Sequence, residues 1–120
     1  MSLPQAVSIQ PHAEAVWALI HAATLDDAAV GQMQEEVAAA AAQHSSLPVI
    51  LDMSNVRFVP STGLGALVGL MRSLKKEGRR FILVGLQPEL RSVLAVTHLD
   101  KLLEIHANFD AALSRLRSVT

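Results

Sequence analysis

The stretch from Val49 to Val68, V-I-L-D-M-S-N-V-R-F-V-P-S-T-G-L-G-A-L-V, decides how the rest of the chain is interpreted. Its first five residues are typical of a buried strand, and its end predicts a helix whose first turn begins at Ser61, Thr62 and Gly63. Two hydroxyl groups are thus placed at a helix N-terminus, where free backbone N–H groups and the helix dipole favour an anion. A phosphate on Ser61 would add about −1.5 to −2 charges to an otherwise neutral, apolar surface. The stretch has the physical outline of a phosphorylation switch.

Signals on both sides of this stretch predict the remaining elements. We expect strands at residues 6–11, 14–22, 49–53, 80–84 and 102–106, and helices at residues 26–43, 62–76, 87–95 and 109–117. This alternation is typical of an α/β fold with a mixed, mainly parallel sheet and about four helices packed on it. No repeat, linker or change of composition divides the chain, so we expect a single domain over residues 1–120.

Several local features follow from the same patterns. The apolar run 16–20 predicts a strand buried on both faces, and Phe58 and Val59 are expected to pack inward. Gly78 suits the position just after a helix, where a left-handed backbone favours glycine. The negative end of the helix dipole and solubility explain the basic cluster within residues 75–80.

The composition excludes several classes of protein. Hydrophobic residues make up 51% of the 120 residues, which is enough for a sizeable core and too much for a disordered chain. The net charge of −1 argues against nucleic acid or an anionic membrane as a partner. There is no cysteine and no secretory signal, and no apolar run approaches the roughly 20 residues of a membrane span. We therefore expect a cytoplasmic protein without a disulfide framework.

Other chemical constellations are weaker. Glycines at positions 63, 65 and 69 resemble a dinucleotide fingerprint, but the segment 54–60 separates them from the preceding strand. We expect small residues there to let the helix lie close to the sheet. Ser61 and Thr62 have an alternative role as simple helix N-caps, which local chemistry alone favours over phosphorylation. No histidine pair has metal-ligand spacing and no serine lies in a nucleophile elbow, so we expect no metal, no cofactor and no enzymatic activity.

Four segments resemble the STAS domain. They are V-I-L-D-M-S-N-V from Val49, F-V-P-S-T-G-L-G-A-L from Phe58, G-R-R-F-I-L-V-G-L-Q-P-E-L-R-S-V-L from Gly78, and T-H-L-D-K-L-L-E-I from Thr97. More narrowly, they are similar to the stand-alone bacterial anti-sigma factor antagonists. The likeness is specific from Val49 to the C-terminus, and before that it rests only on the strand–strand–helix order.

The resemblance implies a small α/β domain that binds an anti-sigma factor, typically a GHKL-type serine kinase. The unphosphorylated antagonist captures this partner; the kinase phosphorylates a serine at the start of the second helix and so breaks the complex, and a phosphatase resets it. In the family motif D-S-[ST]-G-L-G this serine follows an aspartate, so the corresponding residue here is Ser61, with Thr62 as the second candidate. The expected partner-binding face comprises Pro60, Ser61, Thr62, Gly63, Leu64 and Leu67, on a monomer or weak dimer.

Two departures from the family pattern leave alternatives open. Pro60 replaces the motif aspartate, which removes a carboxylate and stiffens the entry to the helix. His98 stands where the family often has glycine. A STAS scaffold or adaptor that is never phosphorylated therefore stays as one alternative, and a small-ligand or nucleotide binder as another.

Overall fold

Five strands form one sheet whose spatial order follows the chain, β1-β2-β3-β4-β5. The computed structural model describes residues 5–44 and 46–118. The strands are β1 (Val7–Gln10), β2 (Val16–Ile20), β3 (Val49–Asp52), β4 (Phe81–Val84) and β5 (Glu104–His106). β1 pairs antiparallel with β2, and the other neighbours are parallel. The predicted mixed, mainly parallel sheet is confirmed.

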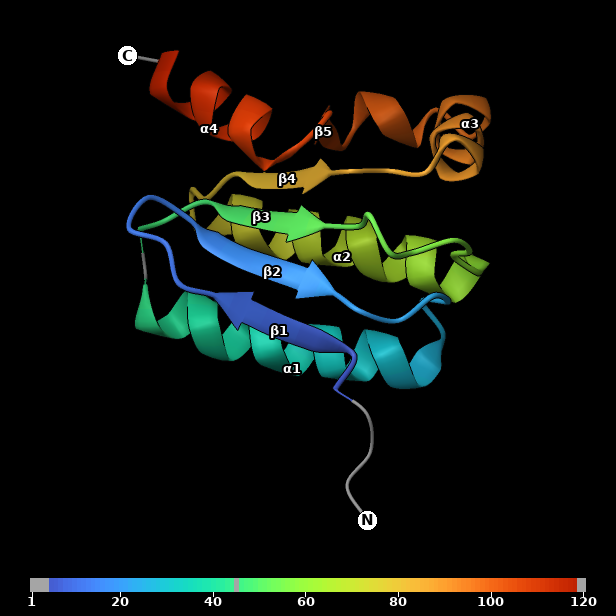
Figure 1. The fold of residues 1–120 in the computed structure, drawn as a ribbon, viewed down its shortest axis with the longest axis horizontal. Coiled ribbons are helices and arrows are strands. Elements are labelled where there is room, and N and C mark those ends of the chain that lie inside the picture. The colour runs from blue at the N-terminus through green and yellow to red at the C-terminus, as the bar shows by residue number, and fades with distance from the viewer. Residues whose placement is uncertain (1–4, 45, 119–120) are drawn as a thin grey trace.

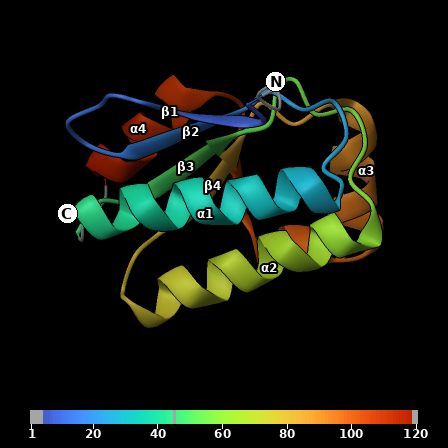
Figure 2. The same cartoon turned by 90° about the horizontal axis from the view of Figure 1, so that it is seen from below.

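The helices cover the two faces of this sheet unequally. They are α1 (Asp27–Gln43), α2 (Ser61–Lys76), α3 (Pro88–Val96), α4 (Phe109–Ser118) and the short 3₁₀ helix η1 (Leu99–Lys101). Each connection between parallel strands leads to the adjacent strand, always in the same direction across the sheet. Right-handed connections therefore place α1, α2 and α3 on the same face. Figure 2 shows α1 and α2 side by side below the sheet and α4 above it.

Two apolar cores correspond to these two faces. The larger lies between the sheet and α1, α2 and α3, and its fully buried members include Met33, Leu51, Leu67, Leu83 and Leu94. The smaller lies under α4 and is built from Ile50, Ile82 and Val84 of the sheet with Ala112 and Leu113 of the helix.

The first three helices begin at the same end of the molecule. Each follows a strand of the parallel set, so its N-terminus lies near the carboxyl end of that strand. Figure 1 shows these three helix starts gathered at the right-hand side. The predicted site at Ser61 is therefore on a surface shared by three helix N-termini.

Strand β2 differs from its prediction. Val16, Ala18 and Ile20 are buried, whereas Trp17 and Leu19 are only partly buried. The run 16–20 was expected to be covered on both faces, but α4 packs mainly on β3, β4 and β5 and reaches β2 only through its first residue, Phe109. The Trp17 ring stacks on the ring of Phe109, with ring centroids 3.8 Å apart.

Within the basic cluster at the end of α2, Arg79 has a role of its own. Arg79 is buried, and its guanidinium donates to the carbonyl oxygens of Ala41 (2.8 Å), His44 (2.7 Å) and Leu47 (2.9 Å). Those carbonyls lie at the end of α1 and in the turn after it. Arg79 thus satisfies carbonyls that an α-helix leaves without partners at its C-terminus. The prediction that the dipole of α2 and solubility explain this cluster is wrong for Arg79.

A residue with a left-handed backbone follows the C-terminal end of α2, and another follows the C-terminal end of α3. Gly78 has a φ of +73°, and the N–H of Arg79 donates to the carbonyl of Leu74 at 2.9 Å, which closes a Schellman motif. The predicted role of Gly78 is confirmed. His98, with a φ of +62°, is the one non-glycine residue with positive φ in the described part of the chain.

The last predicted strand was too long. Residues 102–106 were expected to be extended, but the chain first forms η1, and β5 contains only Glu104–His106. Leu99 and Leu103 pack on the larger core from this connection. Leu103 lies within the predicted strand, but it packs on the core just after the helical turn and before β5 begins.

Candidate functional site

Ser61 is the first residue of α2, and Pro60 is its N-cap. Pro60 offers no side-chain acceptor to the first turn, and its carbonyl accepts from the N–H of Leu64 at 3.0 Å. Within residues 5–44 and 46–118, no acceptor is found for the backbone N–H groups of Ser61, Thr62 and Gly63. The interpretation of Ser61 and Thr62 as N-caps is therefore wrong, because the cap position belongs to Pro60.

The side chains at this helix start differ in exposure. Ser61 and Thr62 are exposed, and Pro60 and Leu64 are partly buried. Leu67 is fully buried in the larger core, and Gly63 is also buried. We therefore correct the expected partner-binding face: Leu67 and Gly63 support it from beneath and do not themselves reach its surface.

Gly63 holds α2 close to the segment that leads into α1. A Cβ atom added at Gly63 would lie 2.8 Å from the carbonyl oxygen of Leu25 and 2.8 Å from Cγ1 of Val59. Added Cβ atoms at Gly65 and Gly69 would meet nothing within 4 Å. Small residues thus permit a close approach at one position only, and the approach is to a loop and not to the sheet as predicted.

Hydrogen bonds tie the loop before α2 to the loop before α1. The N–H groups of Arg57 and Phe58 donate to the carbonyl of Ala23 at 2.8 and 3.2 Å, and the N–H of Leu25 donates to the carbonyl of Phe58 at 3.0 Å. Val59 is buried as expected, but Phe58 is 53% exposed, so its predicted inward packing is wrong. Phe58 forms an isolated parallel bridge with Thr24. Successive residues of an extended chain point to opposite sides, and here the core accommodates Val59.

The charge around the three helix starts is uneven. The carboxylate of Asp26 accepts from the N–H of Ala29 at 3.0 Å and caps α1, whose first turn also contains Asp27. The first turn of α3 contains Glu89. The first turn of α2 has no acidic residue and no side-chain cap. Among these three helices, α2 alone presents its positive end without a carboxylate to balance it.

A separate cluster of ionisable groups lies on β5 and at the residue just before β4. Arg80 and His106 both hydrogen-bond the carboxylate of Glu104, with Nε of Arg80 3.1 Å from Oε1 and Nε2 of His106 2.9 Å from Oε2. Burial raises the pKa of Glu104, but the hydrogen bonds from Arg80 and His106 outweigh it, so this pKa lies below its ordinary value. The cluster joins the edge strand to the sheet.

Neither a metal-binding cluster nor a membrane-spanning helix is found in the described residues. In the described residues, no three or more His, Asp or Glu side chains lie together as a metal ion would need. No helix of that part of the chain is long and apolar enough to cross a membrane.

Comparison with known proteins identifies the family. The model of the STAS domain matches residues 12–112. The chain belongs to the STAS domain family. It is 30% identical over 95 residues to the anti-sigma F factor antagonist of Lysinibacillus sphaericus, a match that covers 79% of this chain and 80% of that protein.

Solved structures of other STAS proteins have the same fold. An anti-sigma factor antagonist from Mycobacterium paratuberculosis is 26% identical with a TM-score of 0.77, and the match covers 98% of this chain and all (100%) of that one. The Bacillus cell fate determinant SpoIIAA in its phosphorylated form is 26% identical with a TM-score of 0.69, and the match covers 92% of this chain and 99% of that one.

The structure gives a physical meaning to both departures from the STAS pattern. The motif aspartate corresponds to Pro60, which occupies the N-cap, the position where an aspartate accepts hydrogen bonds from the first turn. The frequent glycine corresponds to His98, which has the left-handed backbone that glycine adopts without strain.

Proposed function

We propose that this chain is an anti-sigma factor antagonist whose unphosphorylated form binds an anti-sigma factor kinase of the GHKL type. Phosphorylation at Ser61 by that kinase releases the partner, and a phosphatase restores the binding form. The observation that carries the proposal is the exposed Ser61 at the start of α2. Its neighbouring backbone N–H groups have no acceptor among the described residues, and the first turn of its helix has no carboxylate. The relatives named anti-sigma factor antagonist support the role.

The mechanism rests on the difference between a hydroxyl and a dianion at one position. On the free protein, a phosphate on Ser61 gains from the positive end of α2 and from the N–H groups of its first turn. In the complex, the same phosphate would be buried against a partner surface that fits a neutral hydroxyl, at a cost of roughly several kcal/mol. Since about 1.4 kcal/mol changes an affinity tenfold, the complex dissociates.

The binding face in this proposal consists of the residues at the helix start that solvent reaches. Pro60, Ser61, Thr62 and Leu64 contribute directly, and Gly63 sets their position by its contact with the Leu25 carbonyl. The protein acts in the cytoplasm as a single domain over its 120 residues, without catalytic activity of its own.

The test uses the purified chain, ATP and the anti-sigma factor kinase encoded nearest to it. Intact-mass and peptide mass spectrometry should find one added phosphate on Ser61, and none in the Ser61→Ala variant. Affinity for the kinase should be retained in Ser61→Ala and fall at least tenfold in Ser61→Asp. Ser73→Asp places the same charge on an exposed residue of the same helix and should bind like the wild type.

A constitutive STAS scaffold or adaptor is the second candidate, and Pro60 is the observation that favours it. A proline at the N-cap removes the carboxylate of the family motif beside the serine. Absence of phosphate under conditions in which the kinase modifies a control substrate would replace the switch by this second function.

A further inference from the structure

A small apolar hollow lies beside the helix start that carries Ser61. It is lined by Arg57, Phe58 and Val59 from the loop before α2 and by Glu89, Leu90 and Val93 from α3, and its volume is about 130 Å³. An apolar cavity of about 150 Å³ accommodates one benzene molecule. The hollow therefore has the size of one aliphatic side chain and is too small for a nucleotide.

The walls of the hollow expose apolar surface that the fold itself does not use. Phe58 is 53% exposed and Val93 is 41% exposed, and they are two of the four large hydrophobic residues exposed in the described part of the chain. Single exposed apolar residues are common on protein surfaces. Here two of them line one concavity, Phe58 from the loop before α2 and Val93 from α3, together with the buried Val59 and Leu90.

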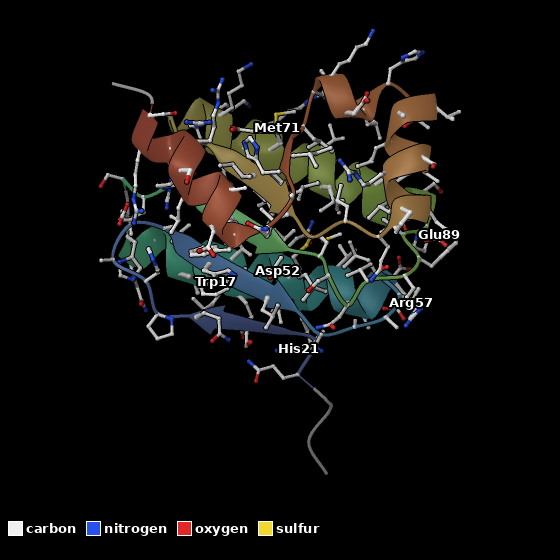
Figure 3. All side chains as sticks on the ribbon, turned by 45° about the horizontal axis from the view of Figure 1, so that its top comes forward. Trp17, His21, Asp52, Arg57, Met71 and Glu89 are labelled. Carbon is white, nitrogen blue, oxygen red and sulfur yellow. The ribbon has the colours of Figure 1, made fainter. Side chains whose placement is uncertain are left out.

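Two opposite charges stand at the rim of this hollow. Figure 3 shows the labelled side chains of Arg57 and Glu89 at the same end of the molecule. Neither side chain makes an ion pair or a hydrogen bond with any residue in the ranges 5–44 and 46–118. The hollow thus combines an apolar floor with one unpaired cation and one unpaired anion, which is the composition of a selective contact at an interface.

We propose that this hollow receives one aliphatic side chain of a partner polypeptide, with an acidic residue beside Arg57 and a basic residue beside Glu89 in the same segment. The inference rests on the proposed function only in taking a protein as the partner. Phe58 lies three residues before Ser61, so a segment seated here lies directly beside the phosphorylated position. The hollow selects the partner, whereas Ser61 controls its release.

The experiment is a selection that needs neither the kinase nor phosphate. A phage library of random twelve-residue peptides is selected on the immobilised full-length chain and on three variants. Val93→Asp places a charge in the wall of the hollow. Val96→Asp places the same charge one turn further along α3, on a residue that is 79% exposed and does not line the hollow. The double variant Arg57→Glu, Glu89→Arg reverses the rim charges at constant net charge.

The expected peptides share an aliphatic residue flanked by one acidic and one basic residue. Their affinity should fall at least tenfold on Val93→Asp and stay within twofold on Val96→Asp, and the double variant should select the reverse order of charges. Val93→Ala should also weaken binding, which separates loss of the wall from an added charge. Circular dichroism confirms that each variant is folded.

Three outcomes would overturn the proposal. The selection yields no common motif; or the selected peptides bind Val93→Asp as well as wild type; or light scattering finds a dimer that Val93→Asp disrupts, which assigns the hollow to a second copy of this chain. None of these outcomes bears on whether Ser61 is phosphorylated, so a failure here leaves the phosphorylation test independent.

Discussion

Replacing Arg79 by methionine removes the side chain that closes the end of α1. Arg79 is 6% exposed, and its guanidinium donates to three carbonyl oxygens at 2.7, 2.8 and 2.9 Å. Arg79→Met keeps much of the side-chain volume but leaves those carbonyls without donors. When a buried ion pair is lost, both of its side chains can be replaced by apolar ones, which removes both polar groups. The partners of Arg79 are backbone carbonyls, which no substitution removes, so they are left without a donor.

The magnitude follows from the number and setting of these bonds. Each hydrogen bond from a charged donor contributes about 1.5–3 kcal/mol, but the sum overestimates the loss, because the exposed His44 carbonyl regains water. A neutral carbonyl left buried without a donor costs about 1–3 kcal/mol, so the carbonyls of Ala41 and Leu47 together cost roughly 2–6 kcal/mol. With an unfolding entropy of about 2.1 cal/mol/K per residue, a chain of 120 residues loses about 8–24 °C in Tm.

The assay is thermal and urea unfolding followed by circular dichroism, with the urea m-value required to stay unchanged. Arg72→Met is the matched control, since Arg72 is exposed on α2, and it should change the unfolding free energy by less than about 0.5 kcal/mol. Arg79→Lys keeps the charge but not the three-way geometry, so its stability should lie between the two. A Tm of Arg79→Met within about 4 °C of wild type, or about 1 kcal/mol, would refute the argument that Arg79 caps α1.

Three further substitutions test the backbone and the charges. Pro60→Asp supplies the N-cap acceptor that α2 lacks and should be more stable than Pro60→Ala by about 1 kcal/mol in urea unfolding; equal stability would contradict the capping argument. His98→Gly relieves a left-handed backbone and should raise the unfolding free energy by about 0.5–1 kcal/mol, whereas Ala95→Gly in α3 should lower it by a similar amount; a destabilised His98→Gly would count against strain. Glu104 has a lowered pKa in the folded state, so its contribution is present above the ordinary value of 4.5 and is lost as pH falls through the folded pKa. Wild type should therefore lose its stability advantage over Glu104→Gln below about pH 4.5, and a constant difference between the two at all pH values would exclude this linkage.

The sheet was predictable because its signals are local. The apolar runs of β3 and β4 are each bounded by polar or turn residues, and the intervening helices have regular apolar spacing, which fixes the order of elements. The helix start at Ser61 was also readable, because hydroxyl residues followed by glycine after a proline mark a helix N-terminus. The predicted N-cap position was wrong by one residue, since the cap is Pro60 and not a hydroxyl residue.

Features that depend on distant contacts were not predictable. Arg79 is 32 to 38 residues from the carbonyls it binds, so nothing near it in the sequence separates it from the exposed Lys75 and Lys76. The outward direction of Phe58 depends on which of two adjacent apolar residues the core accommodates. For His98 a signal was present, because a position where relatives often have glycine indicates a left-handed backbone.

The hydrogen bonds between the loops before α1 and α2 also determine how the candidate site responds to a new charge. Five backbone groups, from Ala23, Leu25, Arg57 and Phe58, are paired across these loops, so opening one loop requires opening the other. Amide protons of Leu25, Arg57 and Phe58 should accordingly exchange with solvent at similar, slow rates, as members of one cooperative unit. If Ser61 is phosphorylated as proposed, a loop held in this way would not relax around the phosphate, and a bound partner would meet the full added charge.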